Sequence, residues 1–250
     1  RDFCLSRGLG DVYKRQLVYF GRKNASPFRL GKTKLYWNIL GKTCTNGSSE
    51  LMTNLSSSIV NTLFNFQLMH FAGEDGVAAY GTLMYVNFIF VAIFLGYSIG
   101  SAPIVSYHYG ARNSEELKNL LTKSLKMIGV WSVALFALAQ LIASPLARIF
   151  VGYDPNLFDL TRHGFRIFCL AFLVNGFNIY GSSFFTALNN GLLSAVISFL
   201  RTLVFQIASV LLLPMIFGID GIWGAVFVAE ILTLCVTIIC LAKKQKVYHY

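Results

Sequence analysis

The feature that most constrains this chain is its series of apolar runs, several of them longer than the roughly 20 residues that a helix needs to cross a membrane. Of the 250 residues, 55% are hydrophobic and only 13% are charged. Soluble globular chains carry about 25% charged residues. The charges of this chain are crowded into the connections between the apolar runs. The sequence therefore predicts an all-α polytopic membrane protein rather than a very apolar soluble domain.

Six of these runs predict a bundle of six transmembrane helices. The expected spans cover residues 48–71, 77–106, 127–150, 161–188, 192–217 and 222–242. Residues 17–47 are expected to contain the end of a preceding helix and a basic cytoplasmic loop, and residues 243–250 a cytoplasmic tail. The connections and the tail on one side of the bundle carry thirteen basic residues, and those on the other side carry three. Cytoplasmic loops are enriched in Lys and Arg, so the basic side is expected in the cytoplasm, with both chain ends.

The first sixteen residues, RDFCLSRGLGDVYKRQ, show no hydrophobic periodicity, and the composition changes abruptly at Leu17. Their last six residues, DVYKRQ, resemble the in-frame translation of a sequencing-adaptor end. We expect residues 1–16 to be a library artefact, with a native cytosolic tail as the alternative, and exclude them from the fold. The artefact interpretation implies that the chain is a fragment of a longer protein.

The first span is unusually polar and supplies four candidate residues for an ion or substrate pathway: Glu50, Asn54, Asn61 and Asn65. Residues four apart share a helix face, as Glu50 and Asn54 do. Lipid cannot satisfy such groups, so this face must meet other helices or water. Glu50 could bind a cation or proton, or could complement the dipole of its helix. The asparagines could line a cavity or hydrogen-bond to neighbouring helices.

The later spans supply five further candidates: Asn175, Asn178, Arg201, Gln206 and Glu230. The three amides leave the same two alternatives open. Arg201 is expected to pair with Glu50 or Glu230, or to extend its charge toward the cytoplasmic membrane surface. Glu230, near the middle of its span, is expected to be a buried, protonated acid, with a gating role as the alternative.

The other chemistry-bearing residues form no catalytic or metal-binding pattern. The four histidines make neither an HExxH nor an HxxxD pattern, which argues against a membrane enzyme. The five cysteines show no CxxC spacing, so neither a metal site nor a disulfide framework is expected. The net charge of +10 is explained by membrane topology rather than by nucleic-acid binding. No cofactor is expected.

Four stretches resemble the carboxy-terminal lobe of the MATE (multidrug and toxic compound extrusion) family. They begin at Gly47, Gly96, Gly181 and Phe217 and read GSSELMTNLSSSIVNTLFNFQL, GYSIGSAPIVSYHYGARN, GSSFFTALNNG and FGIDGIWGAVFVAE. The detail is similar to the bacterial branch of the staphylococcal-type and DNA-damage-inducible members. The sodium-exporting branch carries an acid near the position of Ser57, and its absence here argues against a cation site in this lobe.

This resemblance implies one lobe of a twelve-helix antiporter in the inner membrane of a bacterial cell. Such a protein exports small cationic amphiphilic drugs by alternating access, driven by H⁺ or Na⁺ as the coupling ion. Its partners would be these substrates, the lipid bilayer and a missing amino-terminal lobe. The alternatives are a lipid-linked oligosaccharide flippase of the same superfamily and a fragment that is inactive without its other lobe.

Overall fold

The computed structural model describes residues 18–19, 21 and 36–248, apart from the side chains of residues 49–50 and 246–247. The chain forms two units, Arg1–Gly41 and Lys42–Tyr250, and the arrangement described here is that of the second unit. Its regular structure is helical throughout the described residues, which confirms the predicted all-α class. The expectation for residues 1–16 and most of that for residues 17–47 lie outside the described part of the chain. Residues 37–47, expected in the basic loop, belong to helix α2 instead.

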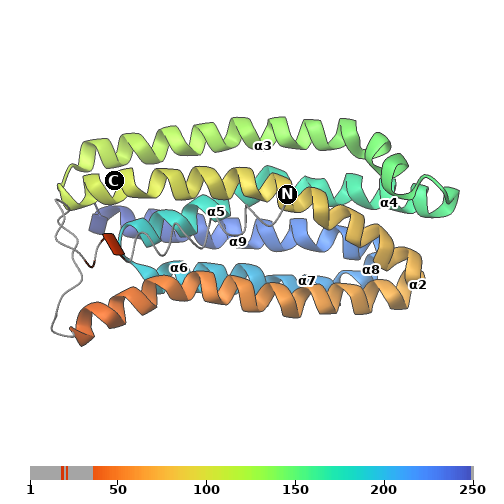
Figure 1. Cartoon of the computed structure of the whole chain (residues 1–250), viewed down its shortest axis with the longest axis horizontal. Helices are drawn as coiled ribbons and strands as arrows, with labels where there is room; N and C mark the ends of the chain where they lie inside the picture. The colour runs from red at the N-terminus through yellow and green to blue at the C-terminus, as the bar shows by residue number, and fades with distance from the viewer. Residues whose placement is uncertain (1–17, 20, 22–35, 249–250) are drawn as a thin grey trace. The chain divides into compact units, whose positions relative to one another are not determined.

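The first helix, α2 (Trp37–Gly110), holds two of the expected spans. A straight helix of 74 residues would extend for about 110 Å, more than three times the thickness of the hydrocarbon core. The chain instead reverses at Gly73, whose φ of 62° and ψ of −149° lie outside the helical region. Glycine adopts this backbone conformation without a steric penalty. Figure 1 shows the resulting two arms, orange and yellow, running in opposite directions.

The other helices make four more crossings of the bundle. They are α3 (Ser114–Val151), α4 (Pro155–Phe168), the 3₁₀ turn η1 (Cys169–Ala171), α5 (Phe172–Ala187), α6 (Gly191–Phe199), the π-helical η2 (Leu200–Phe205), α7 (Gln206–Leu212), α8 (Pro214–Phe217) and α9 (Ile219–Tyr248). Five helical stretches are long and apolar enough to cross a membrane, the first of them being the two-armed α2. The described part of the chain thus contains six membrane-length segments.

Short polar caps separate these crossings. Asn113 precedes α3 and accepts a hydrogen bond from the backbone N–H of Glu116. Asp154 precedes α4, accepts from the backbone N–H groups of Asn156 and Leu157, and is followed by Pro155 at the first helical position. These side chains satisfy N–H groups that have no partner inside the helix. The local sequence therefore fixes where each crossing begins.

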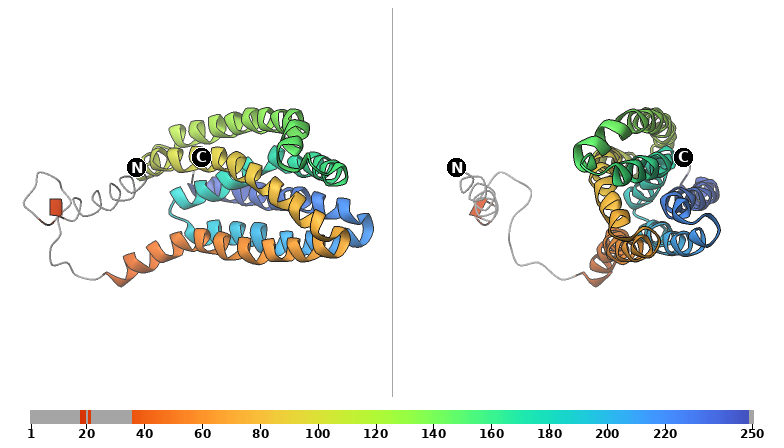
Figure 2. Two further views of the ribbon diagram at one scale, coloured as in Figure 1. Left: turned by 45° about the vertical axis from the view of Figure 1, so that its right-hand side comes forward. Right: turned by 90° about the vertical axis from the view of Figure 1, so that its right-hand side faces the viewer.

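The segment formed by α4, η1 and α5 is the inner layer of the bundle. Two thirds of its most apolar stretch is buried, compared with 22–28% for the other crossings. The teal α5 packs against α3, α6 and α9, and the end-on view of Figure 2 shows it inside the bundle. Glycines permit this close packing, because a Cβ on Gly176 would lie 2.5 Å from the Phe94 ring and one on Gly164 2.6 Å from Trp223. The outer helices leave large apolar side chains exposed, as lipid-facing surfaces do.

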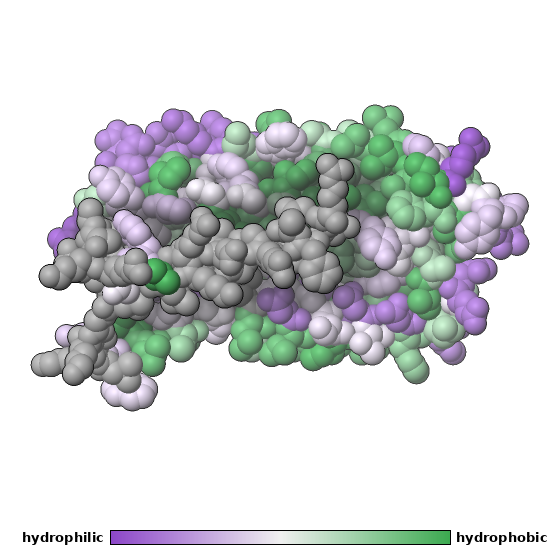
Figure 3. Space-filling view, viewed as in Figure 1, coloured by the Kyte–Doolittle hydropathy of each residue, from purple (hydrophilic) through white to green (hydrophobic). Residues whose placement is uncertain are grey.

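The two ends of the bundle differ in charge. At the end we call the basic end, Ser106 donates to the carbonyl of Ala187 at 2.9 Å, and Asn190 donates to the hydroxyl of Tyr248 at 2.8 Å. The basic end carries Arg112, Lys118, Lys123, Lys243 and Lys244. The opposite, acidic end carries Glu74, Asp75, Asp154, Asp159 and Asp220, with three arginines. Figure 3 shows hydrophobic residues between hydrophilic ends, the pattern expected of a membrane-embedded bundle.

Candidate functional site

Four of the nine candidate residues meet in one buried polar network. Arg201 approaches both carboxylate oxygens of Glu230, with its Nε 2.9 Å from Oε1 and 3.1 Å from Oε2. Its Nη2 lies 2.8 Å from Oε1 of Glu230 and donates to Oδ1 of Asn175 at 2.6 Å. The amide of Asn178 donates to Oε2 of Glu230 at 2.7 Å and to the Glu230 carbonyl at 2.8 Å. We call these four residues the buried network.

Three helical segments position this network. Asn175 and Asn178 lie on α5, one turn apart and therefore on one face. Arg201 lies at the start of the π-helical η2, and Glu230 lies within α9. A π-helical turn is rare and recurs at functional sites in proteins. The wider turn falls where the arginine must reach across to two other helices.

Burial makes the ion pair of this network unusual. The side chain of Glu230 is 1% exposed and that of Arg201 is 15% exposed. Charges removed from water are costly unless geometry and further hydrogen bonds compensate, and the two asparagines supply those bonds. Glu230 is buried as expected and lies at salt-bridge distance from Arg201, and its gating role stays a prediction. Of the alternatives for Arg201, the structure contains the pairing with Glu230.

Hydroxyl groups extend the polar interior from this network. Thr237 donates to Oδ1 of Asn178 at 3.2 Å. Ser182 on α5 lies 2.8 Å from the hydroxyl of Ser194 and 3.0 Å from that of Ser198, both on α6. Sequence reasoning missed these residues, although two signals mark them: Ser194 and Ser198 are four apart, and Thr237 follows Glu230 by two helical turns.

Among the other five candidates, Asn61, Asn65 and Gln206 do not join the network. On the first arm of α2, Asn61 accepts a hydrogen bond from the hydroxyl of Tyr80 on the second arm, at 2.8 Å. This contact matches the helix-packing alternative. The side chain of Asn54 is exposed, and that of Asn65 is partly exposed. Gln206 begins α7 and is partly exposed. The Glu50 side chain lies outside the described residues, so its pairing and its ion-binding role stay predictions.

A metal centre finds no support in the described residues, among which no three His, Cys, Asp or Glu side chains lie close enough to hold an ion. What the buried network can do is hold a charge inside an apolar bundle. In a membrane, such ionisable groups mark ion or substrate pathways more often than structural contacts. The described geometry therefore favours transport chemistry.

A family model, MatE, matches residues 51–212, which is more than half of the chain. The chain belongs to the MatE family. The family membership predicted from the four motif stretches is thus confirmed. The matched range contains the polar first arm of α2 together with Asn175, Asn178 and Arg201, whereas Glu230 lies beyond it.

Two curated relatives of this MatE chain are described as a multidrug resistance protein and a transporter. It is 22% identical over 205 residues to a protein of Bacillus subtilis described as probable multidrug resistance protein YoeA, covering 80% of this chain and 43% of that protein. It is 25% identical over 199 residues to an FAD transporter of Shewanella oneidensis, covering 78% of this chain and 42% of that one. The chain therefore spans about two fifths of the length of these relatives.

Solved structures share the MatE fold at low sequence identity. A crystal structure of MATE in the straight conformation superposes with a TM-score of 0.87 at 19% identity, covering 98% of this chain and 55% of that one. An outward-facing multidrug resistance MATE family transporter superposes with a TM-score of 0.83 at 20% identity, covering 98% of this chain and 55% of that one. An inward-facing transporter of the same family superposes with a TM-score of 0.78 at 19% identity, covering 98% of this chain and 57% of that one. Nearly the whole chain thus adopts a fold that makes up about half of a MATE transporter.

Proposed function

We propose that this chain is one six-helix lobe of a cation-coupled efflux antiporter. It exports small cationic amphiphilic compounds by alternating access and takes H⁺ or Na⁺ as its coupling ion. Membership of the MatE family supports transport, and the multidrug resistance protein of Bacillus subtilis supports this substrate class. The transporter is complete only with a second lobe, because the chain spans about two fifths of its curated relatives.

The observation that carries this proposal is the buried network. Glu230 is held by Arg201 and Asn178, and the arginine retains a partly exposed side chain. A cation or proton that neutralises the carboxylate would weaken its hold on Arg201 and free the guanidinium for a new partner. Because η2 and α9 carry the two charges, this exchange would let the two segments shift relative to each other. Ion binding is in this way linked to a change of conformation.

The polar first arm of α2 supports the proposed second lobe. Asn54 and Ser57 are exposed on a helix that is long and apolar enough to cross a membrane. Ser57 donates to the carbonyl of Thr53 at 2.7 Å, and polar side chains of membrane helices face other helices or a water-filled cavity rather than lipid. We infer that this arm borders the substrate cavity between two lobes. The basic end of the bundle then faces the cytoplasm and the acidic end the outside of the cell.

A second candidate function is the export of a flavin nucleotide. It is favoured by the FAD transporter of Shewanella oneidensis, which is 25% identical to this chain. A flavin nucleotide is an anion, so its export would require cationic groups in the cavity rather than the amides of α2. Flipping of a lipid-linked oligosaccharide is a further alternative, and inactivity of the isolated lobe is an outcome that the following experiment separates.

The test is an efflux assay on the natural gene that encodes this segment, expressed in bacteria without their own efflux pumps. We expect export of ethidium that stops when the proton or sodium gradient is collapsed. Glu230→Gln should abolish the coupling, whereas Glu115→Gln, which neutralises an exposed carboxylate of α3, should leave it unchanged.

Export that persists without either gradient would contradict the antiporter. Flavin export without ethidium export would favour the second candidate, and a segment inactive alone but active with its other lobe would identify the half-transporter.

A further inference from the structure

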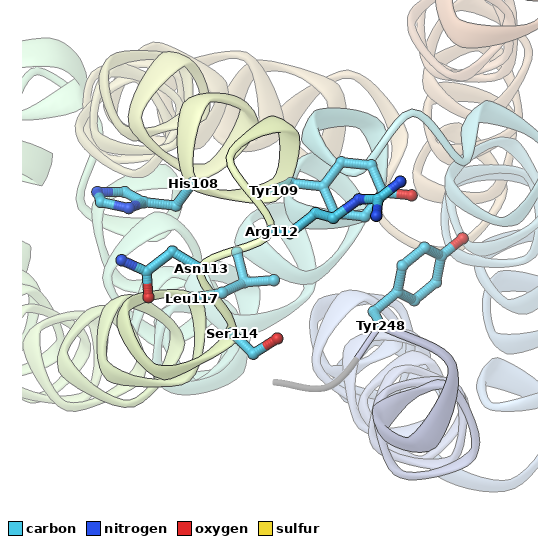
Figure 4. Close-up of a pocket in the computed structure, with 7 residues that line it drawn as sticks. All are labelled: His108, Tyr109, Arg112, Asn113, Ser114, Leu117 and Tyr248. Carbon is cyan, nitrogen blue, oxygen red and sulfur yellow. The ribbon is translucent and has the colours of Figure 1, made fainter.

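A small cavity lies at the basic end of the bundle, away from the buried network. Its volume is about 180 Å³. Cavities for drug-sized ligands are larger, roughly 300–1,000 Å³. It is lined by His108, Tyr109, Arg112, Asn113, Ser114, Leu117 and Tyr248. Figure 4 shows Arg112 and Tyr109 on the same side as Tyr248, with Leu117 between them and His108. The cavity therefore joins the end of α2, the start of α3 and the end of α9.

The lining is suited to an anion. It includes the guanidinium of Arg112 and the hydroxyl of Ser114, and no acid occurs among its seven residues. Arg112 lies in the turn between α2 and α3, where its φ is 54° and its backbone N–H donates to the carbonyl of Tyr109. The Nδ1 atom of His108 is buried and has no hydrogen-bond partner among the described residues. Glu115 and Glu116 follow on the first turn of α3 but do not line the cavity.

The position of the cavity is that of a lipid headgroup. The rings of Tyr109 and Tyr248 meet edge to face with their centroids 5.7 Å apart, and amphipathic rings of this kind concentrate where hydrocarbon meets headgroups. Leu117 is buried beneath the polar lining. On α2, Tyr107 directly precedes the lining residue His108 and is 71% exposed, and Ile104, about one turn before His108, is 49% exposed. A ligand with a phosphate in the cavity could thus lay its acyl chains along an apolar helix surface.

We propose that this cavity binds the headgroup phosphate of an anionic phospholipid from the adjoining leaflet. Arg112 supplies the charged contact, Ser114 a hydroxyl, and Lys243 and Lys244 on α9 add attraction at longer range. Cytoplasmic leaflets carry the anionic lipids, and juxtamembrane basic residues are attracted to them. The proposal goes beyond the transport function and does not depend on which compound is exported.

The test measures lipid retention by the full chain purified in detergent, using native mass spectrometry with phosphatidylglycerol or phosphatidylcholine added in equal amounts. We expect preferential retention of phosphatidylglycerol, reduced about five- to tenfold by Arg112→Gln, since one basic contact is lost. The Arg112→Lys variant keeps the positive charge and should retain most of the bound phosphatidylglycerol. The matched control is Lys118→Gln, which removes an exposed charge at the same end but outside the cavity, and its effect should stay below about twofold.

Three results would overturn the proposal. The first is equal retention of both lipids by the unaltered chain. The second is an equal loss of phosphatidylglycerol in the Arg112→Gln and Lys118→Gln variants, which would indicate a diffuse attraction to the basic end. The third is displacement of phosphatidylglycerol by millimolar inorganic phosphate, which would assign the cavity to a soluble anion. Because no transport is measured, failure of the efflux proposal would leave this test intact.

Discussion

Two contacts between a basic and an acidic side chain of this chain have the same shortest separation but lie in opposite environments. Arg201 and Glu230 approach to 2.8 Å in the interior, with side chains 15% and 1% exposed. His163 on α4 and Asp220 on α9 also approach to 2.8 Å, but at the acidic end, with side chains 58% and 50% exposed. The first pair is surrounded by asparagine side chains that complete its hydrogen bonds, whereas the second faces the medium.

The difference shows that the distance between the two charged groups does not by itself determine how much the pair contributes to the stability of the fold. A buried pair carries a desolvation cost, so removing one partner leaves an uncompensated charge in the interior. An exposed pair is screened by water and salt, and contributes about 0–1 kcal/mol. The interior pair is therefore the one on which both stability and transport should depend.

The largest expected effect follows from breaking the interior pair on one side. Glu230→Leu leaves the guanidinium of Arg201 without its carboxylate and should lower the free energy of unfolding by about 3–5 kcal/mol. Unfolding of the purified protein in detergent micelles, followed by circular dichroism, measures this. The double variant Arg201→Met, Glu230→Leu removes both charges and should recover most of the loss. A double variant no more stable than Glu230→Leu alone would show that the charges are not the cause.

An intermediate effect is expected from the asparagines that surround the interior pair. Asn178→Ala removes two donated hydrogen bonds to Glu230, one of them to its carboxylate, and should cost about 1–3 kcal/mol in the same unfolding measurement. The matched control is Asn61→Ala, which removes the single contact to Tyr80 and should cost about 0.6 kcal/mol. If both variants lost the same free energy of unfolding, contact with the ion pair would not increase the contribution of Asn178 to stability.

The smallest effect is expected at the acidic end. His163→Ala should change the free energy of unfolding by less than about 1 kcal/mol, and any loss seen at low salt should disappear near 1 M salt. Unfolding at two ionic strengths provides the measurement. A loss that matches that of Glu230→Leu, or one that persists in high salt, would refute the distinction between the two pairs.

Much of the fold could be predicted from the sequence because membrane spans need long apolar runs, and those are visible without coordinates. The described residues contain six membrane-length segments, but the helices capped by Asn113 and Asp154 begin at Ser114 and Pro155, before the expected span starts at residues 127 and 161. The expected spans 48–71 and 77–106 place a reversal at residues 72–76, but they do not show that one residue, Gly73, joins the two arms, or that the crossing through α4 and α5 is the inner one. Both depend on how the helices pack, which hydropathy does not encode.

The members of the candidate site were predicted from the sequence, and one of the two pairings expected for Arg201, that with Glu230, is present, but the contacts with Asn175 and Asn178 were not predicted. Polar residues inside apolar runs marked Asn175, Asn178, Arg201 and Glu230, yet the same rule also marked Asn54 and Asn65, which lie elsewhere. Spacing along one helix relates residues of that helix only. Arg201 and Glu230 belong to different segments, so their pairing depends on the rotation of η2 and α9 about their axes. Three-dimensional packing decides that rotation.

The reversal at Gly73 leaves the acidic end with only short connections among the described residues. One residue joins the arms of α2, and the other connections at this end are Gly152–Asp154, between α3 and α4, and Gly218, between α8 and α9. A protease needs an extended stretch of several residues, so we expect enzymes added from that side to leave the described chain uncut. Antibodies raised against linear peptides also bind extended segments, so we expect them not to bind the described residues at this end. Reporters or affinity tags for sidedness experiments belong at the opposite end of the bundle.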